Sequence, residues 1–180
     1  SAANALPVKV SPALWDILRQ SKMAFDQSGG AFDITIGPLS RLWRKARKKK
    51  QFPGSESVMK TKQLVGFNKI IFDTLHQQVT LTQAGMHLDL GGIAQGYIAQ
   101  KVMDYLATQH IQQALVNVSG DIAVSGAPPG ADGWTVGINI PENADELLPL
   151  KLQLQYKAVT TSGDIYQFIE HDGKRYSHII

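Results

Sequence analysis

Residues Met86–Leu106, MHLDLGGIAQGYIAQKVMDYL, contain the change of pattern from which the fold can be inferred. A short apolar run with one acid, Leu88 to Leu90, leads into Gly91 and Gly92, and a segment with helical periodicity follows. Its apolar residues are spaced as on one face of an amphipathic helix, which predicts a single buried stripe. The predicted stripe comprises Ile93, Ala94, Tyr97, Ile98, Val102, Tyr105 and Leu106. The predicted order is therefore strand, glycine turn, helix.

The glycine turn has two interpretations. Without a Cβ at Gly91 or Gly92, backbone N–H groups can approach a ligand, and the helix start adds unpaired donors suited to phosphate. Asp89 would then lie beside the same opening, where its carboxylate could meet a ribose hydroxyl, an amino group or a metal. Alternatively, the glycines only permit close packing at the helix start. Their spacing, G-G-x-x-x-G, matches neither a Rossmann turn nor a P-loop.

Composition predicts one globular domain over residues 1–180, because 43% hydrophobic residues suffice for a core. The formal net charge of +3 comes largely from one basic segment on a predicted helix end. Such a run is typical of a solvated surface, and no aromatic residues interleave it as in single-strand binders, so we expect no nucleic-acid partner. The basic residues of this segment are Arg41, Arg44, Lys45, Arg47, Lys48, Lys49 and Lys50.

Disulfides and thiolate metal sites are excluded because the chain has no cysteine. No run of 18 apolar residues predicts a membrane span. The first residues, SAANALPVKV, have neither the basic start nor the apolar core of a signal peptide.

Helices and strands follow one another without a regular alternation. Helices are predicted over residues 12–28, from Gly37-Pro38 onward, and over residues 55–64. Residues 31–39 are predicted as a short strand or extended loop, in which Asp33 either caps a local turn or faces a ligand. Strands are predicted at 69–73, 78–81, 88–90, 114–118, 122–126, 134–140, 152–156, 157–161, 168–170 and 174–180, mostly in consecutive hairpins.

The strand at 88–90 is expected to join the sheet formed by the two strands before it. The turn at Ser119-Gly120-Asp121 is either a plain hairpin turn or part of a pocket. A doubly wound sheet would need strand and helix to alternate throughout. The pattern instead predicts an α+β fold with an antiparallel or mixed sheet flanked by helices.

Five segments, in order, resemble the ApbE family of FAD:protein FMN transferases. They are GGAFDITIGPLSRLW, LDLGGIAQGY, ALVNVSGDIAVSG, AVTTSGD and YSHII. The resemblance extends over nearly the whole chain. It implies an ApbE-like fold and a Mg²⁺-dependent transfer of FMN from FAD to a Thr or Ser hydroxyl of an acceptor protein, with release of AMP. FAD pyrophosphatase activity is a related possibility.

The resemblance also assigns residues to this chemistry. Ala31, Phe32 and Asp33 would line the FAD pocket, Asp89 and Gln95 would contact FAD, and a main-chain carbonyl at Gly92 would bind Mg²⁺. His178 would lie beside the pyrophosphate and act in catalysis. Many members of the family have lysine where this chain has Gln95, so a neutral amide replaces a charge that could meet phosphate.

The chain departs from the family pattern at both ends. The family's N-terminal segment is expected before Ser1, and its Asp-Pro and later metal-binding Asp and Thr are expected after Ile180. We therefore expect a central fragment with weak metal binding and little turnover. Family members are exported in bacteria, often as lipoproteins, which implies a periplasmic location through a lipid anchor outside this chain. The alternatives are a non-catalytic flavin-binding or scaffold module, or an inactive fragment.

Overall fold

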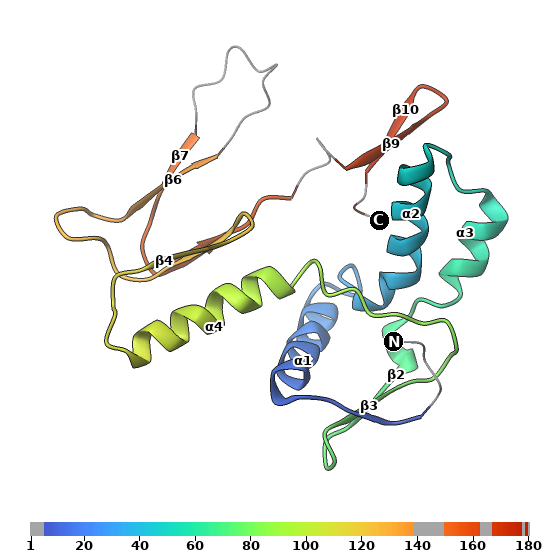
Figure 1. Ribbon diagram of the computed structural model, residues 1–180, viewed down its shortest axis with the longest axis horizontal. Helices are drawn as coiled ribbons and strands as arrows, with labels where there is room; N and C mark the ends of the chain where they lie inside the picture. The colour runs from blue at the N-terminus through green and yellow to red at the C-terminus, as the bar shows by residue number, and fades with distance from the viewer. Residues whose placement is uncertain (1–5, 139–149, 163–166, 178, 180) are drawn as a thin grey trace. The chain divides into compact units, whose positions relative to one another are not determined.

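The computed structural model describes residues 6–138, 150–162, 167–177 and 179, which form helices and antiparallel strand pairs (Figure 1). This confirms the predicted α+β class. The chain divides into two compact units: Ser1–Ile93 with Tyr166–Ile180, and Ala94–Ile165. The prediction of a single domain over residues 1–180 stays a prediction. In the part of the chain described, no helix is both long and apolar enough to cross a membrane.

The first unit begins with strand β1 (Val8–Lys9) and helix α1 (Pro12–Gln27). The helix starts as its sequence predicts, because the Ser11 hydroxyl accepts the backbone N–H of Leu14 at 3.2 Å and Pro12 occupies the first turn. It ends where Gly29 and Gly30 take positive φ values of 61° and 88°, a conformation that glycine adopts without a steric penalty.

A short 3-10 helix η1 (Ile34–Ile36) leads directly into helix α2 (Gly37–Lys49). Of residues 31–39, which were predicted as a short strand or extended loop, residues 31–33 are irregular with Asp33 extended, whereas residues 34–36 form η1 and α2 begins at Gly37 as predicted. The reason is local, because Asp33 caps η1 by accepting the N–H of Thr35 at 2.8 Å. Helix α3 (Ser55–Lys62) packs beside α2.

Three strands of the first unit form one sheet, ordered β1-β3-β2. Strand β2 (Ile70–Asp73) follows a second 3-10 helix, η2 (Phe67–Lys69), and pairs antiparallel with β3 (Gln78–Leu81). The register pairs Ile70 with Leu81, and β1 adds Val8 opposite Val79. The two predicted strands at 69–73 and 78–81 are confirmed.

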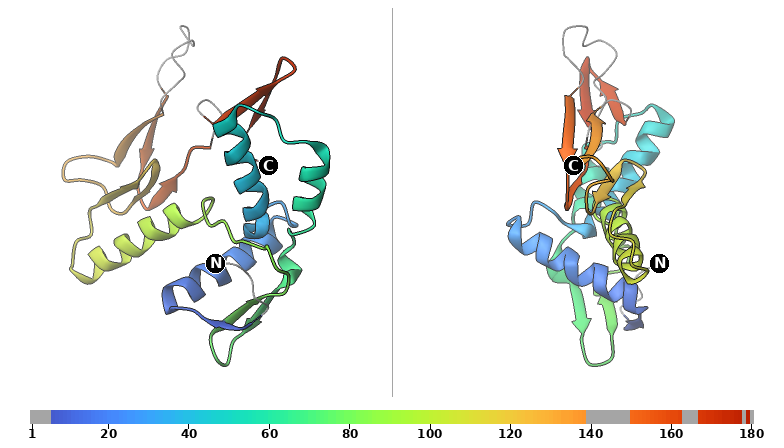
Figure 2. Two further views of the ribbon diagram at one scale, coloured as in Figure 1. Left: turned by 45° about the vertical axis from the view of Figure 1, so that its right-hand side comes forward. Right: turned by 90° about the vertical axis from the view of Figure 1, so that its left-hand side faces the viewer.

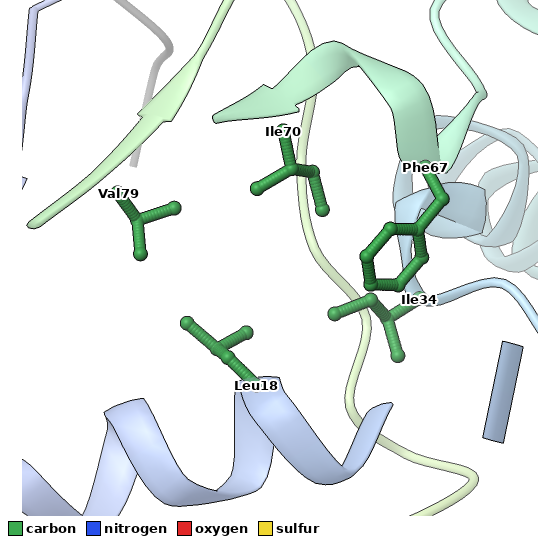
Figure 3. Packing of buried hydrophobic residues seen from close by; sticks show 5 residues of the cluster. All are labelled: Leu18, Ile34, Phe67, Ile70 and Val79. Carbon is green, nitrogen blue, oxygen red and sulfur yellow. The ribbon is translucent and has the colours of Figure 1, made fainter. Parts of the chain in front are cut away.

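The core of the first unit lies between α1 and this sheet. Figure 3 shows Leu18 of α1 directed toward Ile70 and Val79 of the strands, with Ile34 and Phe67 beside them. Each of these side chains is at most 7% exposed. Burying such a side chain contributes about 1.5–3 kcal/mol, so this cluster holds η1, and with it Asp33, against the sheet.

The predicted strand at residues 88–90 is wrong. Residues 86–90 form no regular structure, and the N–H of Asp89 donates to the carbonyl of Ile34 at 2.7 Å rather than to a strand. The alternation of side chains is nevertheless as expected, because Leu88 and Leu90 pack against the core of the unit. The side chains of this segment therefore alternate as in a strand, but its backbone hydrogen bond goes to η1 and not to a neighbouring strand.

The C-terminal hairpin, β9 (Phe168–His171) and β10 (Lys174–Ser177), also belongs to the first unit. Although far from α2 in sequence, it lies beside that helix (Figures 1 and 2). The indole N–H of Trp43 donates to the carbonyl of Ser177 at 2.8 Å, and Arg47 donates to Gln167 at 3.0 Å. These bonds and a cluster of rings around Phe52 attach the hairpin to α2.

The second unit contains helix α4 (Ala94–Thr108), which packs on β4 (Leu115–Val118) and β5 (Asp121–Val124). Strand β5 also pairs antiparallel with β8 (Lys157–Val159), giving the order β4-β5-β8. Strands β6 (Trp134–Ile138) and β7 (Leu150–Leu154) form a separate antiparallel pair. Val124, Val136 and Leu154 form the buried cluster of this unit.

The buried stripe predicted on α4 is only partly right. Ile98, Val102 and Tyr105 are exposed at 47%, 39% and 63%, whereas Ala99 is buried and Met103 and Leu106 are half-buried. Ile93, Ala94, Tyr97 and Leu106 of the predicted stripe are half-buried, so the packed face overlaps the predicted one but is shifted toward Ala99 and Met103. The apolar spacing identified the helix correctly but only part of its packed face.

Candidate functional site

Asp89 lies immediately before the glycine turn and is held from three directions. Its Oδ1 accepts the N–H of Gly91 at 3.0 Å, and its Oδ2 accepts a donor from Arg44 of α2 at 2.6 Å. Its own N–H bonds to Ile34. With 18% of its side chain exposed, the carboxylate is largely screened from water and has a fixed orientation beside the turn.

Phe32 forms one wall of the same turn. A Cβ added to Gly92 would lie 3.2 Å from Cε2 of Phe32, closer than ordinary van der Waals contact. Gly91 and Gly92 are exposed, and Ala31 is exposed next to the half-buried Phe32. The first unit therefore brings Phe32, Asp89 and the two glycines together, although they come from segments about 60 residues apart.

Asp33 is half-buried, and its Oδ1 caps η1 by accepting from both the N–H and the hydroxyl of Thr35. The predicted capping role of Asp33 is thus confirmed. No bond to Oδ2 occurs among the residues that the structure describes. One oxygen of Asp33 therefore maintains the local fold.

Two arginines of α2 approach the segment before the turn. Arg41 contacts Nε2 of His87 at 2.7 Å, and Arg44 pairs with Asp89. Because a guanidinium has donors only, Nε2 of His87 is the acceptor in the first of these bonds. Sequence reasoning treated the basic segment as a solvated surface and missed both contacts. The three-residue spacing of Arg41, Arg44 and Arg47 was the available signal, because it places them along one inclined row of the helix.

The remaining predicted site residues are distributed differently. Gln95 is half-buried on the first turn of α4, in the second unit. His178 lies outside the described residues, as do residues 139–140 of one predicted strand and Gly163 and Asp164 of a predicted motif. Their assignments stay predictions.

A second cluster of motif residues lies within the second unit. The hydroxyl of Thr160, after β8, donates to Oδ1 of Asp121 at the start of β5. A Cβ on Gly96 of α4 would lie 3.8 Å from the other oxygen of Asp121. Ser119 and Gly120 take positive φ values in the turn between β4 and β5, so the predicted hairpin there is confirmed.

The described residues do not assemble a metal centre from side chains alone. Nowhere in the described ranges do three His, Asp or Glu side chains gather closely enough to hold an ion. The predicted ligand at Gly92 is a main-chain carbonyl on an exposed turn, and one carbonyl does not make a site.

Comparison with known proteins gives a consistent result. The model of the ApbE family matches residues 1–180. A protein of Klebsiella pneumoniae described as FAD:protein FMN transferase is 35% identical over 179 residues, covering 99% of this chain and 55% of the relative.

Two solved structures resemble the fold. The ApbE protein of Thermotoga maritima superposes with a TM-score of 0.85 at 27% identity, covering 97% of this chain and 57% of that one. The flavin transferase ApbE of Vibrio cholerae gives 0.82 at 25% identity, covering 99% and 56%. The chain thus spans about half the length of the relatives that it matches.

Proposed function

The chain belongs to the ApbE family, and from this membership we propose that it binds FAD and takes part in FMN transfer to an acceptor protein. The acceptor would offer a Thr or Ser hydroxyl, and AMP would be the second product. Hydrolysis of FAD to FMN and AMP is the same phosphorus chemistry with water as the acceptor. Relatives about twice as long as this chain are described as FAD:protein FMN transferases.

In the proposed transfer the acceptor oxygen forms a bond to the phosphorus of the FMN half. The bond from that phosphorus to the bridging oxygen breaks, and AMP leaves with this oxygen. The acceptor hydroxyl loses its proton to a base, and the developing charge on the phosphate oxygens must be stabilised. His178 is the proposed partner of the pyrophosphate, since an imidazole can either donate to phosphate or take up a proton near neutral pH.

The geometry around Gly91 and Gly92 is the observation that best supports FAD binding. Asp89 is fixed against the Gly91 N–H at 3.0 Å, and the ring of Phe32 lies against Gly92. An apolar ring could contact the flavin ring system, an oriented carboxylate could accept from a hydroxyl or amino group, and an exposed glycine backbone could donate to phosphate. Asp33, Ala31 and Gln95 are proposed as further contacts to FAD.

Mg²⁺ is part of the proposal, because a divalent cation would neutralise the pyrophosphate when bound. The carbonyl of Gly92 is its proposed protein ligand. Because the described side chains do not fit a complete metal site, we derive no step of the transfer from the metal. By the same family resemblance, we propose that the parent protein acts on the periplasmic side of the inner membrane through a lipid anchor.

FAD binding by the chain is the decisive test. When FAD is titrated with the protein, the quenching of flavin fluorescence should reach saturation. Bound FAD should also raise the melting temperature of the protein. A second measurement adds Mg²⁺ and an acceptor peptide containing Thr, with a matched peptide in which Val replaces Thr. A mass gain of FMN on the Thr peptide alone supports transfer. Binding without transfer supports a flavin-binding module, and an unchanged melting temperature with unquenched flavin contradicts the proposal.

A further inference from the structure

The basic segment of α2 separates into two sets of residues. Arg41, Arg44 and Arg47 follow one another at three-residue intervals, and each contacts a distant segment of the first unit. Lys45, Lys48 and Lys49 lie between and after them and are exposed. The arginines are exposed as well, so their partners, and not their burial, distinguish this row from the lysines.

Within the row, Arg44 has the partner of greatest chemical consequence. Arg41 contacts a histidine and Arg47 contacts a neutral amide, whereas Arg44 meets the carboxylate of Asp89 at 2.6 Å. The other oxygen of that carboxylate is occupied by the Gly91 N–H. Arg44 and Gly91 together fix both oxygens, so the plane of the carboxylate is set by α2 on one side and by the glycine turn on the other.

This pairing matters because of the charge of the proposed ligand. The pyrophosphate of a dinucleotide carries two negative charges, and a carboxylate beside the same turn would repel it. A guanidinium at 2.6 Å compensates the charge of the carboxylate locally. Arg44 is 64% exposed, so salt will screen part of this effect.

We propose that Arg44 is the positioning residue of the flavin site: it orients Asp89 and compensates its charge so that the pyrophosphate can approach Gly91 and Gly92. This inference rests on the proposed function. Arg44 acts through Asp89 rather than by contacting the reacting atoms.

The test compares Arg44→Gln with Arg47→Gln. Both substitutions remove one positive charge from the same helix, one turn apart, but only Arg44 faces a carboxylate. We expect Arg44→Gln to raise the Kd for FAD about tenfold at low salt, and by less at high salt, whereas Arg47→Gln changes it less than about twofold. Arg44→Lys keeps the charge without the planar fork and should give an intermediate Kd.

A double-mutant cycle separates positioning from direct phosphate contact. In a protein already carrying Asp89→Asn, Arg44→Gln should change the Kd less than about twofold, because its partner charge is gone. An undiminished loss in that background would overturn the positioning role. Equal effects of Arg44→Gln and Arg47→Gln, with normal binding by the unsubstituted protein, would overturn this inference alone. If the unsubstituted protein fails to bind FAD, the proposed function fails and the inference with it.

Discussion

The hydroxyl of Thr35 donates to Oδ1 of Asp33 at 2.7 Å, and the same carboxylate oxygen accepts the backbone N–H of Thr35. Thr35 is fully buried, and its hydroxyl oxygen in turn accepts the N–H of Gly66 at 2.7 Å. One side chain thus links η1 to the loop before η2 and holds Asp33 in place. A proposed FAD contact is therefore supported by a buried hydrogen-bond chain.

Thr35→Val should destabilise the protein without changing the volume of the buried side chain much. The substitution leaves the Gly66 N–H without its acceptor, which costs about 1–3 kcal/mol of unfolding free energy. Urea denaturation followed by tryptophan fluorescence measures this cost. Thr35→Ser keeps the hydroxyl and is the control, expected to lose only about 0.8 kcal/mol for one buried methyl group. A larger loss for Ser than for Val would contradict the role given to the hydroxyl.

Gly37→Ala should be among the costly substitutions in the chain. A Cβ at this position would overlap the carbonyl oxygen of His87 and lie 2.8 Å from the carbonyl carbon of the same residue. These are backbone atoms, which cannot move aside as the end of a flexible side chain can. We expect a loss of about 1–3 kcal/mol in unfolding free energy. Gly137→Ala, where no atom lies within 4 Å of the added Cβ, should change stability by less than about 0.5 kcal/mol. Equal losses at the two positions would show that the contact with His87 is unimportant.

Gly92→Ala tests the turn itself. The added Cβ would press on the ring of Phe32 at 3.2 Å, which half-buried Phe32 can accommodate only by shifting. We expect folding to be little changed but FAD binding to weaken by about 1 kcal/mol, or roughly fivefold in Kd. Isothermal titration with FAD measures this, with Gly54→Ala, which has open space around its Cβ, as the control. Unaltered FAD affinity in Gly92→Ala would argue against a flavin beside Phe32.

Capping and turn residues made much of the fold predictable. Ser11-Pro12 and Gly29-Gly30 delimit α1, Gly37-Pro38 begins α2, and Asp172-Gly173 forms the turn between β9 and β10. Each of these caps and turns depends only on residues a few positions apart, so the sequence alone is enough to predict it. The strand predicted at residues 88–90 failed because its backbone partner, Ile34, is more than 50 residues away and the side-chain alternation is the same with or without a ladder.

The candidate site was predictable in its residue types but not in its connections. Asp89 beside a glycine turn is visible in the sequence, whereas the Arg44 that holds it belongs to a basic run of the kind that usually faces solvent. Only the packing of α2 against residues 86–90 distinguishes Arg41 and Arg44 from the lysines beside them. The buried stripe on α4 was predicted only in part for a related reason, since apolar residues occur on more than one side of this helix and their spacing alone does not determine which of them pack.

His76→Ala should raise the pKa of Asp73. The side-chain hydrogen bond from His76, at 2.7 Å in the turn between β2 and β3, is the main cause that lowers the pKa of Asp73 below its ordinary value of 3.8. Because the folded-state pKa is lowered, the stabilisation is present above pH 3.8 and is lost as the pH falls through the lowered value. Carboxyl carbon chemical shifts followed by NMR from acid to neutral pH measure the change.

His110→Ala removes a histidine from the second unit and should leave the titration of Asp73 unchanged. The difference in urea midpoint between the unsubstituted protein and His76→Ala should shrink as the pH falls below the pKa of Asp73. A difference that persists at low pH would show that His76 stabilises the turn by another route.

Trp43→Phe should loosen the C-terminal hairpin selectively. The substitution keeps a ring near Phe52, which lies 5.5 Å from Trp43 between ring centroids, but removes the indole N–H that bonds to Ser177. A lost hydrogen bond of about 0.5–1.5 kcal/mol should speed amide exchange in β9 and β10 about 2- to 10-fold. Amide exchange in strands β2 and β3 should be unchanged.

Trp15→Phe is the control, because the Trp15 ring packs on Phe72 within the core. It should give the reverse pattern, with faster exchange in β2 and no change in the hairpin. If both substitutions speed exchange in the hairpin equally, the attachment of the hairpin to α2 does not depend on the hydrogen bond from Trp43. The cluster of rings around Phe52 must then hold it.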